Sequence, residues 1–227
     1  MSVASAAQQV GTSGTPDADS AELVAAALRL DADTLVAVLE AYIARVGVAA
    51  TWTSGAGRPW SRPANSASEH VKRCVDVVHL LSSAITIALH RIRSPSPATP
   101  CRPPVLLACM PGERHTLPLE ALRAALGDRH IPVHCFGANL PISALLHALH
   151  RTIQPAAALI LWSHRPIALP AAIRKACAVR GIELFVPGPG WITPYPGVIS
   201  LTSITHALSI FTNFGLGPNS GEVREYP

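Results

Sequence analysis

The chain has 227 residues, of which 49% are hydrophobic and 14% are charged, and its formal net charge is +4. This apolar content can bury one core of ordinary size plus a smaller one, so two compact units are expected. Charge gives no reason to expect a nucleic-acid-binding protein, because the few Lys and Arg residues form no continuous run.

Cysteine usage and the terminal sequence point to a cytoplasmic protein. The five cysteines are odd in number and show no Cys-x-x-Cys spacing, which argues against a disulfide framework or a zinc site. Residues 1–19 lack the basic and apolar regions of a signal peptide and are predicted to be a disordered leader. No apolar stretch reaches transmembrane length, so no contact with a membrane is expected.

A helical domain resembling a four-helix bundle is predicted over residues 20–93. Asp19 followed by Glu22 favours a capping box at the start of a first helix, and Asp33 is expected to cap a second. The second helix has apolar residues at helical spacing, namely Leu35, Val38, Leu39, Tyr42, Ile43 and Val46. A third helix is expected from about 69 to 93, with its core side at Val71, Cys74, Val75, Val78, Ser82, Ile85, Leu89 and Ile92.

An α/β domain is predicted over residues 105–211, after a Pro-rich linker at 94–104 and before a frayed tail at 212–227. Apolar runs without polar alternation are typical of parallel strands whose two sheet faces are both covered by helices. Short helical crossovers predict a five-stranded, flavodoxin-like (Rossmann-type) sheet. Strands are expected at 105–110, 132–136, 157–162, 182–186 and 197–201, and helices at 117–127, 141–152, 169–180 and 203–211.

His115 is the strongest candidate for a ligand-binding residue. Ligands of parallel sheets bind beyond the carboxyl ends of the strands, and the segment 111–116 leaves the first strand at that end. A neutral imidazole is a good metal ligand, and Glu113 is placed to orient it. The alternative is an ordinary exposed loop histidine. No nucleophile-base-acid set and no Gly-x-Gly-x-x-Gly motif is present, so the chain is not expected to be an enzyme by itself.

Together with the helical domain, this pattern resembles the cobalamin-binding module of CarH-type light sensors and methionine-synthase-like proteins, over about residues 20–211. That family has an acid-x-His motif after the first strand, a small or hydroxyl residue after the third and a glycine pair after the fourth. The resemblance implies that His115 is the lower axial cobalt ligand of base-off adenosylcobalamin. The cofactor-binding residues that it implies in this domain are Glu113, Arg114, His115, Thr116, Leu117, Ser163, Gly188, Gly190 and Trp191.

The sequence departs from that family at two places. Pro118 stands where the methyltransferase carriers have glycine, a form that resembles the light-sensor branch. In the cap over the cobalamin, the tryptophan and glutamate positions hold Ser68 and Val78, and the histidine position holds His79. The smaller cap resembles that of the photocobilins, which hold a bilin beside the cobalamin. No room for a helix-turn-helix precedes the helical domain, so direct DNA binding is not expected.

The resemblance to photocobilins implies a biliverdin site in the helical domain. The residues implied there are Tyr42, Trp52, Trp60, His79 and Ser83, with Arg58 and Arg62 for the propionates. Plain interpretations stay open: Trp52 and Tyr42 as core, the two arginines as solvated charges, and the His79 stripe as a solvent-facing surface. After photolysis, His79 is expected as the upper ligand, or His70 through a poorer match to the family's cap motif.

The leading hypothesis is therefore a light-sensing protein in which light breaks the cobalt–carbon bond and alters quaternary structure or partner binding. The expected partners are the two small-molecule chromophores and either further copies of the chain, in a light-dependent homo-oligomer, or an unknown downstream protein. Two alternatives stay open. One is a corrinoid carrier subunit of a methyltransferase system, and the other is an interaction module that has kept the fold without the cofactor.

Overall fold

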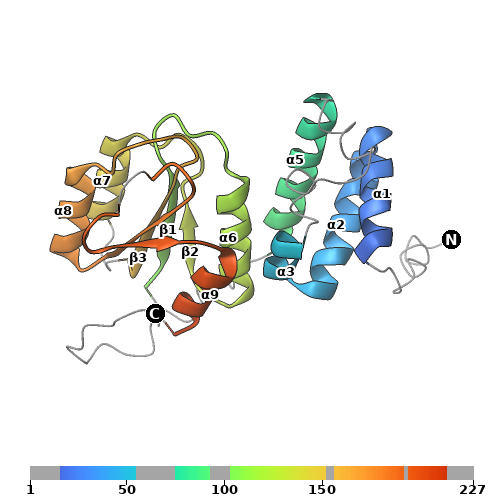
Figure 1. Cartoon of the computed structure of the whole chain (residues 1–227). Coiled ribbons are helices and arrows are strands. Elements are labelled where there is room, and N and C mark those ends of the chain that lie inside the picture. The colour runs from blue at the N-terminus through green and yellow to red at the C-terminus, as the bar shows by residue number, and fades with distance from the viewer. Residues whose placement is uncertain (1–15, 55–74, 93–102, 152–155, 192–193, 214–227) are drawn as a thin grey trace. The chain divides into compact units, whose positions relative to one another are not determined.

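A computed structural model describes residues 16–54, 75–92, 103–151, 156–191 and 194–213. The chain divides into two compact units, residues 1–88 and 89–227, which are described separately below (Figure 1). Among the helices in the described ranges, none combines the length and the apolar character that a membrane span needs.

The first unit is helical and contains α1 (Pro16–Leu28), α2 (Ala32–Val46), α3 (Val48–Ser54) and most of α5 (Val75–Arg91). α2 packs against both α1 and α3. The buried side chains of α1 to α3 are mostly aliphatic and comprise Leu23, Ala26, Ala27, Leu35, Val36, Leu39, Tyr42, Val48 and Thr51.

Both predicted caps of this unit are wrong. α1 begins at Pro16, so Asp19 lies inside the helix, and its carboxylate pairs with the guanidinium of Arg45. The predicted leader therefore overlaps α1. α2 is capped by Asp31 and not by Asp33, because the Asp31 carboxylate accepts a hydrogen bond from the Thr34 amide at 3.1 Å. An N-cap side chain reaches the amide two or three positions ahead, and either aspartate satisfied the sequence rule.

The buried face of α5 is rotated from the predicted one. The buried residues are Val77, Leu81, Ala84, Ile85, Ala88 and Leu89. Val75, which was predicted to be core, is 69% exposed. α5 carries apolar residues on more than one side, so that spacing alone is compatible with more than one buried face. The predicted start of this helix, residues 69–74, lies outside the described residues.

The second unit is a five-stranded parallel sheet with helices on both faces. Its elements are β1 (Val105–Cys109), α6 (Leu117–Asp128), β2 (Val133–Cys135), α7 (Ile142–Arg151), β3 (Ala158–Trp162), α8 (Ala171–Arg180), β4 (Glu183–Pro187), β5 (Val198–Leu201) and α9 (Ile204–Asn213). The strand order is β2-β1-β3-β4-β5. This confirms the flavodoxin-like prediction, with element ends that differ by one or two residues.

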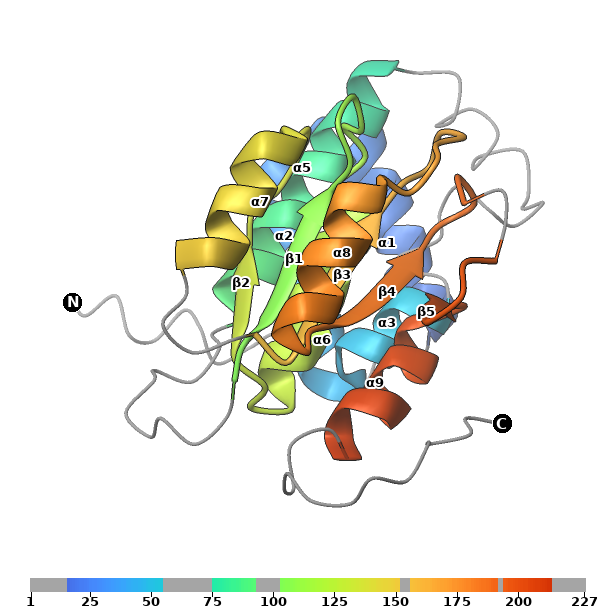
Figure 2. The same ribbon diagram turned by 90° about the vertical axis from the view of Figure 1, so that its left-hand side faces the viewer.

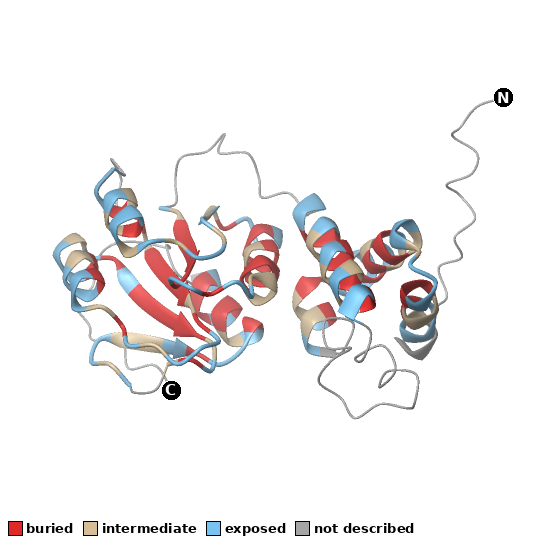
Figure 3. Ribbon diagram, turned by 90° about the horizontal axis from the view of Figure 1, so that it is seen from above, coloured by how far each residue is buried: buried red, intermediate tan, exposed pale blue. Residues whose placement is uncertain are grey.

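Each face of the sheet is covered by a different pair of helices. α7 and α8 cover one face, and α6 and α9 cover the other (Figure 2). The three central strands β1, β3 and β4 are almost wholly buried between them, whereas the edge strands β2 and β5 are mostly half-buried or exposed (Figure 3). On the α6 and α9 side, Phe185 of β4 and Phe211 of α9 are each 0% exposed, and their ring centroids are 4.9 Å apart. On the other side, Leu159 and Leu161 of β3 pack with residues of α7 and α8.

The sheet order places the first and third strands side by side at the point where the winding reverses. β1 has β2 on one side and β3 on the other, and Cys109 is paired with Trp162 at the carboxyl ends. In doubly wound sheets, the crevice at this switch point is where ligands bind. The loops that follow β1 and β3 are therefore the expected place for a ligand-binding site in this unit.

Replacing Phe211 by alanine tests whether α9 belongs to the core of the second unit. The substitution Phe211→Ala is expected to lower the free energy of unfolding by about 3–5 kcal/mol, since it leaves a cavity beside Phe185. Urea unfolding followed by circular dichroism measures the loss. Phe136→Ala is the control, because Phe136 is 38% exposed and its loss is expected to cost less than about 1 kcal/mol. Equal effects would contradict the described packing of α9.

Candidate functional site

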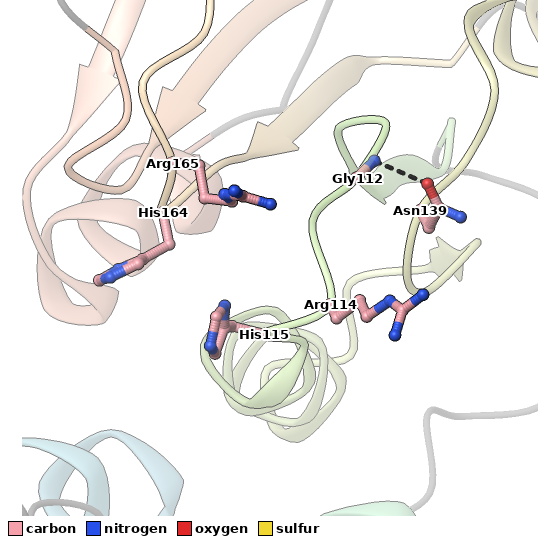
Figure 4. Close-up of a pocket in the computed structure, with 6 residues that line it drawn as sticks. All are labelled: Gly112, Arg114, His115, Asn139, His164 and Arg165. Carbon is pink, nitrogen blue, oxygen red and sulfur yellow. Dashed lines mark hydrogen bonds between the residues drawn. The ribbon is translucent and has the colours of Figure 1, made fainter.

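The candidate site lies beyond the carboxyl ends of β1 and β3. Strand pairing continues one residue past β1, since the Met110 amide donates to the carbonyl of Trp162, the last residue of β3, at 3.0 Å. A pocket of about 570 Å³ opens there (Figure 4). Its lining residues come from the loops after β1, β2 and β3 and are Gly112, Arg114, His115, Asn139, His164 and Arg165.

Glu113 joins two of these loops from beneath the pocket. Its side chain is 1% exposed. One carboxylate oxygen accepts hydrogen bonds from the amide of His115 at 2.8 Å and from its ring Nδ1 at 2.7 Å. The other oxygen accepts from the amides of His164 at 2.7 Å and Arg165 at 3.4 Å. The carboxylate therefore fixes the loop after β1 to the loop after β3.

This network keeps Glu113 ionised. Burial by itself raises the pKa of the carboxyl group above its ordinary value of 4.5. Hydrogen bonds from the amides of His115 and His164, the bond from the His115 ring and the charge of that ring outweigh burial and lower the pKa to about 2. An ionised carboxylate accepts hydrogen bonds and donates none. His115 Nδ1 must therefore carry the proton in this contact.

The imidazole of His115 is held in one orientation and is accessible to a ligand. With Nδ1 bonded to Glu113, the other ring nitrogen, Nε2, is free to act as a ligand in the neutral ring. The side chain is 69% exposed. The ring of His164 lies beside it, with centroids 5.2 Å apart and planes tilted by 54°. The predicted acid–histidine pair is thus assembled, with the imidazole held by Glu113, and its role as a cobalt ligand stays a prediction.

The loop after β2 completes the support of this segment. The amide of Gly112 donates to Asn139 Oδ1 at 2.6 Å, and the Asn139 amide donates to the Glu113 carbonyl at 2.9 Å. Asn139 itself has a φ of 50°, a left-handed conformation that asparagine tolerates better than most residues. Sequence reasoning missed Asn139, His164 and Arg165. Their positions just after β2 and β3 were the available signal, because the predicted strand order brings those ends next to β1.

The predicted serine and glycines hold the loops after β3 and β4 together. Ser163 is 1% exposed and its hydroxyl donates to the carbonyl of Arg165 at 2.7 Å. A Cβ atom on Gly188 would lie 2.3 Å from the Ser163 carbonyl oxygen, and one on Gly190 would lie 2.2 Å from that of Arg165. Both glycines are therefore required for close approach of two backbones. Direct contact between these residues and a ligand stays a prediction.

The other predicted residues of this domain occupy defined structural positions. Thr116 is the N-cap residue of α6 and Leu117 is the first residue of that helix, and both are half-buried. Arg114 is exposed in the pocket lining. The Trp191 indole donates to the carbonyl of Pro187 at 2.8 Å, and the ring packs against the core between the sheet, α7 and α8. Trp191 thus has a structural role, and ligand contact at Trp191 stays a prediction.

In the helical unit, the burial of Tyr42 favours its plain interpretation as a core residue. Tyr42 is 5% exposed within the core, with the guanidinium of Arg45 located 5.1 Å from its ring centroid. Trp52 is half-buried in α3, and His79 and Ser83 are exposed on α5. Val78, at the glutamate position of the cap, is half-buried on α5. The other residues predicted for a bilin or for the cap lie outside the described residues, namely Arg58, Trp60, Arg62, Ser68 and His70.

The chemistry of the second unit fits a macrocycle-bound cobalt. Among the described residues, no three His, Cys, Asp or Glu side chains are grouped to hold a free metal ion. A metal that already has four ring nitrogens needs one axial ligand from the protein, and His115 is the pocket residue whose imidazole is placed for it; this role stays a prediction. At the carboxyl end of β3, the buried Nε1 of Trp162 has no hydrogen-bond partner among the described residues. A buried donor without a partner is costly, which is consistent with an acceptor that a ligand or water supplies.

The charge of Glu113 should make the second unit sensitive to acid. A folded-state pKa of about 2 against an ordinary value of 4.5 means that the carboxylate stabilises the fold above about pH 4.5. This contribution, about 3 kcal/mol, is lost as the pH falls from 4.5 to 2. In urea unfolding, Glu113→Gln is expected to be less stable than wild type at pH 7 and to converge with it near pH 2. Asp128→Asn, at an exposed position of α6, is the control, and a constant Glu113→Gln deficit would contradict the assignment.

No protein-family model and no curated protein matches the sequence. Similar solved structures include a cobalamin-binding protein from Desulfitobacterium hafniense DCB-2, with 13% identity, coverage of 85% of this chain and 96% of that one, and a TM-score of 0.39. The Methanosarcina barkeri methanol:cobalamin methyltransferase complex MtaBC has 15% identity, coverage of 88% and 84%, and a TM-score of 0.41. The monomethylamine corrinoid protein of Methanosarcina barkeri has 9% identity, coverage of 84% and 95%, and a TM-score of 0.47. These likenesses concern the arrangement of elements and assign no ligand to this chain.

Proposed function

We propose that this chain binds a cobalamin in the base-off form, with His115 Nε2 as the lower axial ligand of cobalt. The observation that carries the proposal is the pair formed by buried, ionised Glu113 and exposed His115 at the sheet's switch point. The carboxylate fixes Nδ1 as the protonated nitrogen and so presents Nε2 as the donor. The solved proteins named above carry cobalamin or corrinoid in their names, which agrees with this choice of macrocycle.

Each residue of the site has a defined part in this function. A bound cobalamin would supply a cobalt–carbon bond that can be broken and formed again. Glu113 accepts a hydrogen bond from His115 Nδ1, which holds the ring in one orientation and leaves Nε2 as the donor to cobalt. Asn139 and the His164 amide hold Glu113 and its loop in place, so that the imidazole is positioned before a ligand arrives.

For the biological output, we favour a corrinoid carrier that presents its cofactor to a partner protein. A carrier requires only the His115 site, and all lining residues of that site belong to the second unit. The light-sensing hypothesis requires further ligands from the helical unit, where Tyr42 is committed to core packing. As a carrier the chain is not itself a catalyst, and its partner would be a methyltransferase.

A light sensor remains the second candidate, and the exposed imidazole of His79 on α5 favours it. A free histidine is able to occupy an axial position that light has vacated. Biliverdin as a second chromophore belongs to this candidate alone. Its predicted pocket includes Trp60, Arg58 and Arg62, which lie outside the described residues.

His115→Ala tests the cobalamin proposal. Protein loaded with cob(II)alamin after growth on ¹⁵N-labelled histidine is expected to show a two-line nitrogen splitting in its electron paramagnetic resonance spectrum, because one ¹⁵N nucleus is bound to cobalt. The alanine variant should lose this splitting and keep its circular dichroism. His147→Ala, exposed on α7, is the control. A splitting that survives in His115→Ala would assign the axial position to another residue.

Illumination separates the two outputs. If the chain is a carrier, its mass in solution with bound adenosylcobalamin is expected to be the same in the dark and after green light, by size-exclusion chromatography with light scattering. A light-dependent mass that His79→Ala abolishes would support the sensor instead. Ser83→Ala, one turn along α5 and equally exposed, is the matched control for that substitution.

A further inference from the structure

Two guanidinium groups in the pocket have no anionic partner within the described part of the chain. Arg114 follows Glu113 in the loop after β1, and Arg165 lies in the loop after β3. Both side chains are exposed. The backbone amide of Arg165 reaches Glu113, but neither guanidinium takes part in a described ion pair. Figure 4 shows the Arg165 side chain reaching from its loop toward the loop that carries Gly112 and Arg114.

Glu113 is the acidic residue that contacts both loops, and its capacity to accept hydrogen bonds is already used. Both of its oxygens accept hydrogen bonds from His115 or from the loop after β3, and it lies beneath the pocket at 1% exposure. Thr116, the N-cap residue of α6, makes no side-chain capping bond, and Glu120, the acidic residue of the first turn, is paired with Arg123. The open face of the pocket therefore presents excess positive charge.

We propose that Arg114 and Arg165 bind an anionic oxygen group of the ligand that His115 holds, and so select among corrinoids. This inference rests on the proposed cobalamin site and assigns its specificity. Guanidinium groups form stronger, often two-pronged hydrogen bonds with phosphate or carboxylate than with neutral amides. Cobalamin has amides around its ring and one phosphodiester in its nucleotide tail. Corrinoids with free acid side chains offer carboxylates at the rim of the ring.

Three corrinoids distinguish the two sources of negative charge. Aquocobalamin carries the phosphodiester and amides, cobyrinic acid carries carboxylates without the phosphodiester, and cobinamide carries amides with neither anionic group. Absorbance titrations with full-length protein give the three dissociation constants. Wild type is expected to bind at least one of the two anionic corrinoids about 10- to 100-fold more tightly than cobinamide, as expected for one or two charge-assisted hydrogen bonds.

The variants Arg114→Gln and Arg165→Gln, singly and together, measure the arginine contribution. The double variant is expected to lose this preference and to bind cobinamide as wild type does. Arg151→Gln is the matched control, because it removes the same charge from an exposed position at the end of α7. Raising the salt concentration should weaken binding of the preferred corrinoid in wild type more than in the double variant.

The outcomes separate this inference from the proposed function. Weakening of cobalamin alone identifies the phosphodiester as the anionic group, weakening of cobyrinic acid alone identifies rim carboxylates, and either supports the inference. Equal affinities of wild type for the three corrinoids, or equal weakening of all three in the double variant, overturns it. The cobalamin proposal fails by a different result, namely that no corrinoid shows histidine nitrogen bound to cobalt.

Discussion

The structure of the site depends on one buried carboxylate. Glu113 accepts hydrogen bonds from the backbone amide and the ring Nδ1 of His115. It also accepts one from the amide of His164, in the loop after β3. A single side chain therefore sets the geometry of two loops and the protonated nitrogen of the imidazole between them. Burial raises the pKa of the Glu113 carboxyl group, and these hydrogen bonds lower it. The pKa is low because the hydrogen bonds outweigh burial.

The position of this carboxylate follows from the sheet. β1 lies between β2 and β3, so the loops after these three strands converge at one edge. Glu113 comes from the first loop, Asn139 from the second and His164 from the third. Helices pack on both faces of the sheet. Hydrogen bonds through Glu113 and Asn139 then hold the loops after β1, β2 and β3 together. The same sheet that provides stability thus fixes the position of the His115 imidazole.

The α/β unit could be predicted almost completely from the sequence, because continuous apolar strands alternate with amphipathic helices and the crossovers are short. His115 and Glu113 were identified for the same reason: they directly follow a well-marked strand. Arg165 and His164 were missed because no motif marks them and their importance depends on three-dimensional neighbours. In the helical unit, Val75 was assigned to the core although it is exposed, since apolar residues surround α5 and periodicity does not select one face.

The close approach of the loops after β3 and β4 has an optical consequence. Gly190 donates its amide to the Ser163 carbonyl and accepts from the Ile167 amide, so the two loops are fastened on both sides of Arg165. Trp191 is the next residue, and its indole is anchored to Pro187. A displacement of the loop after β3 will therefore change the surroundings of this indole. Among the four tryptophans of the chain, Trp191 is therefore expected to change its fluorescence when the loop after β3 moves.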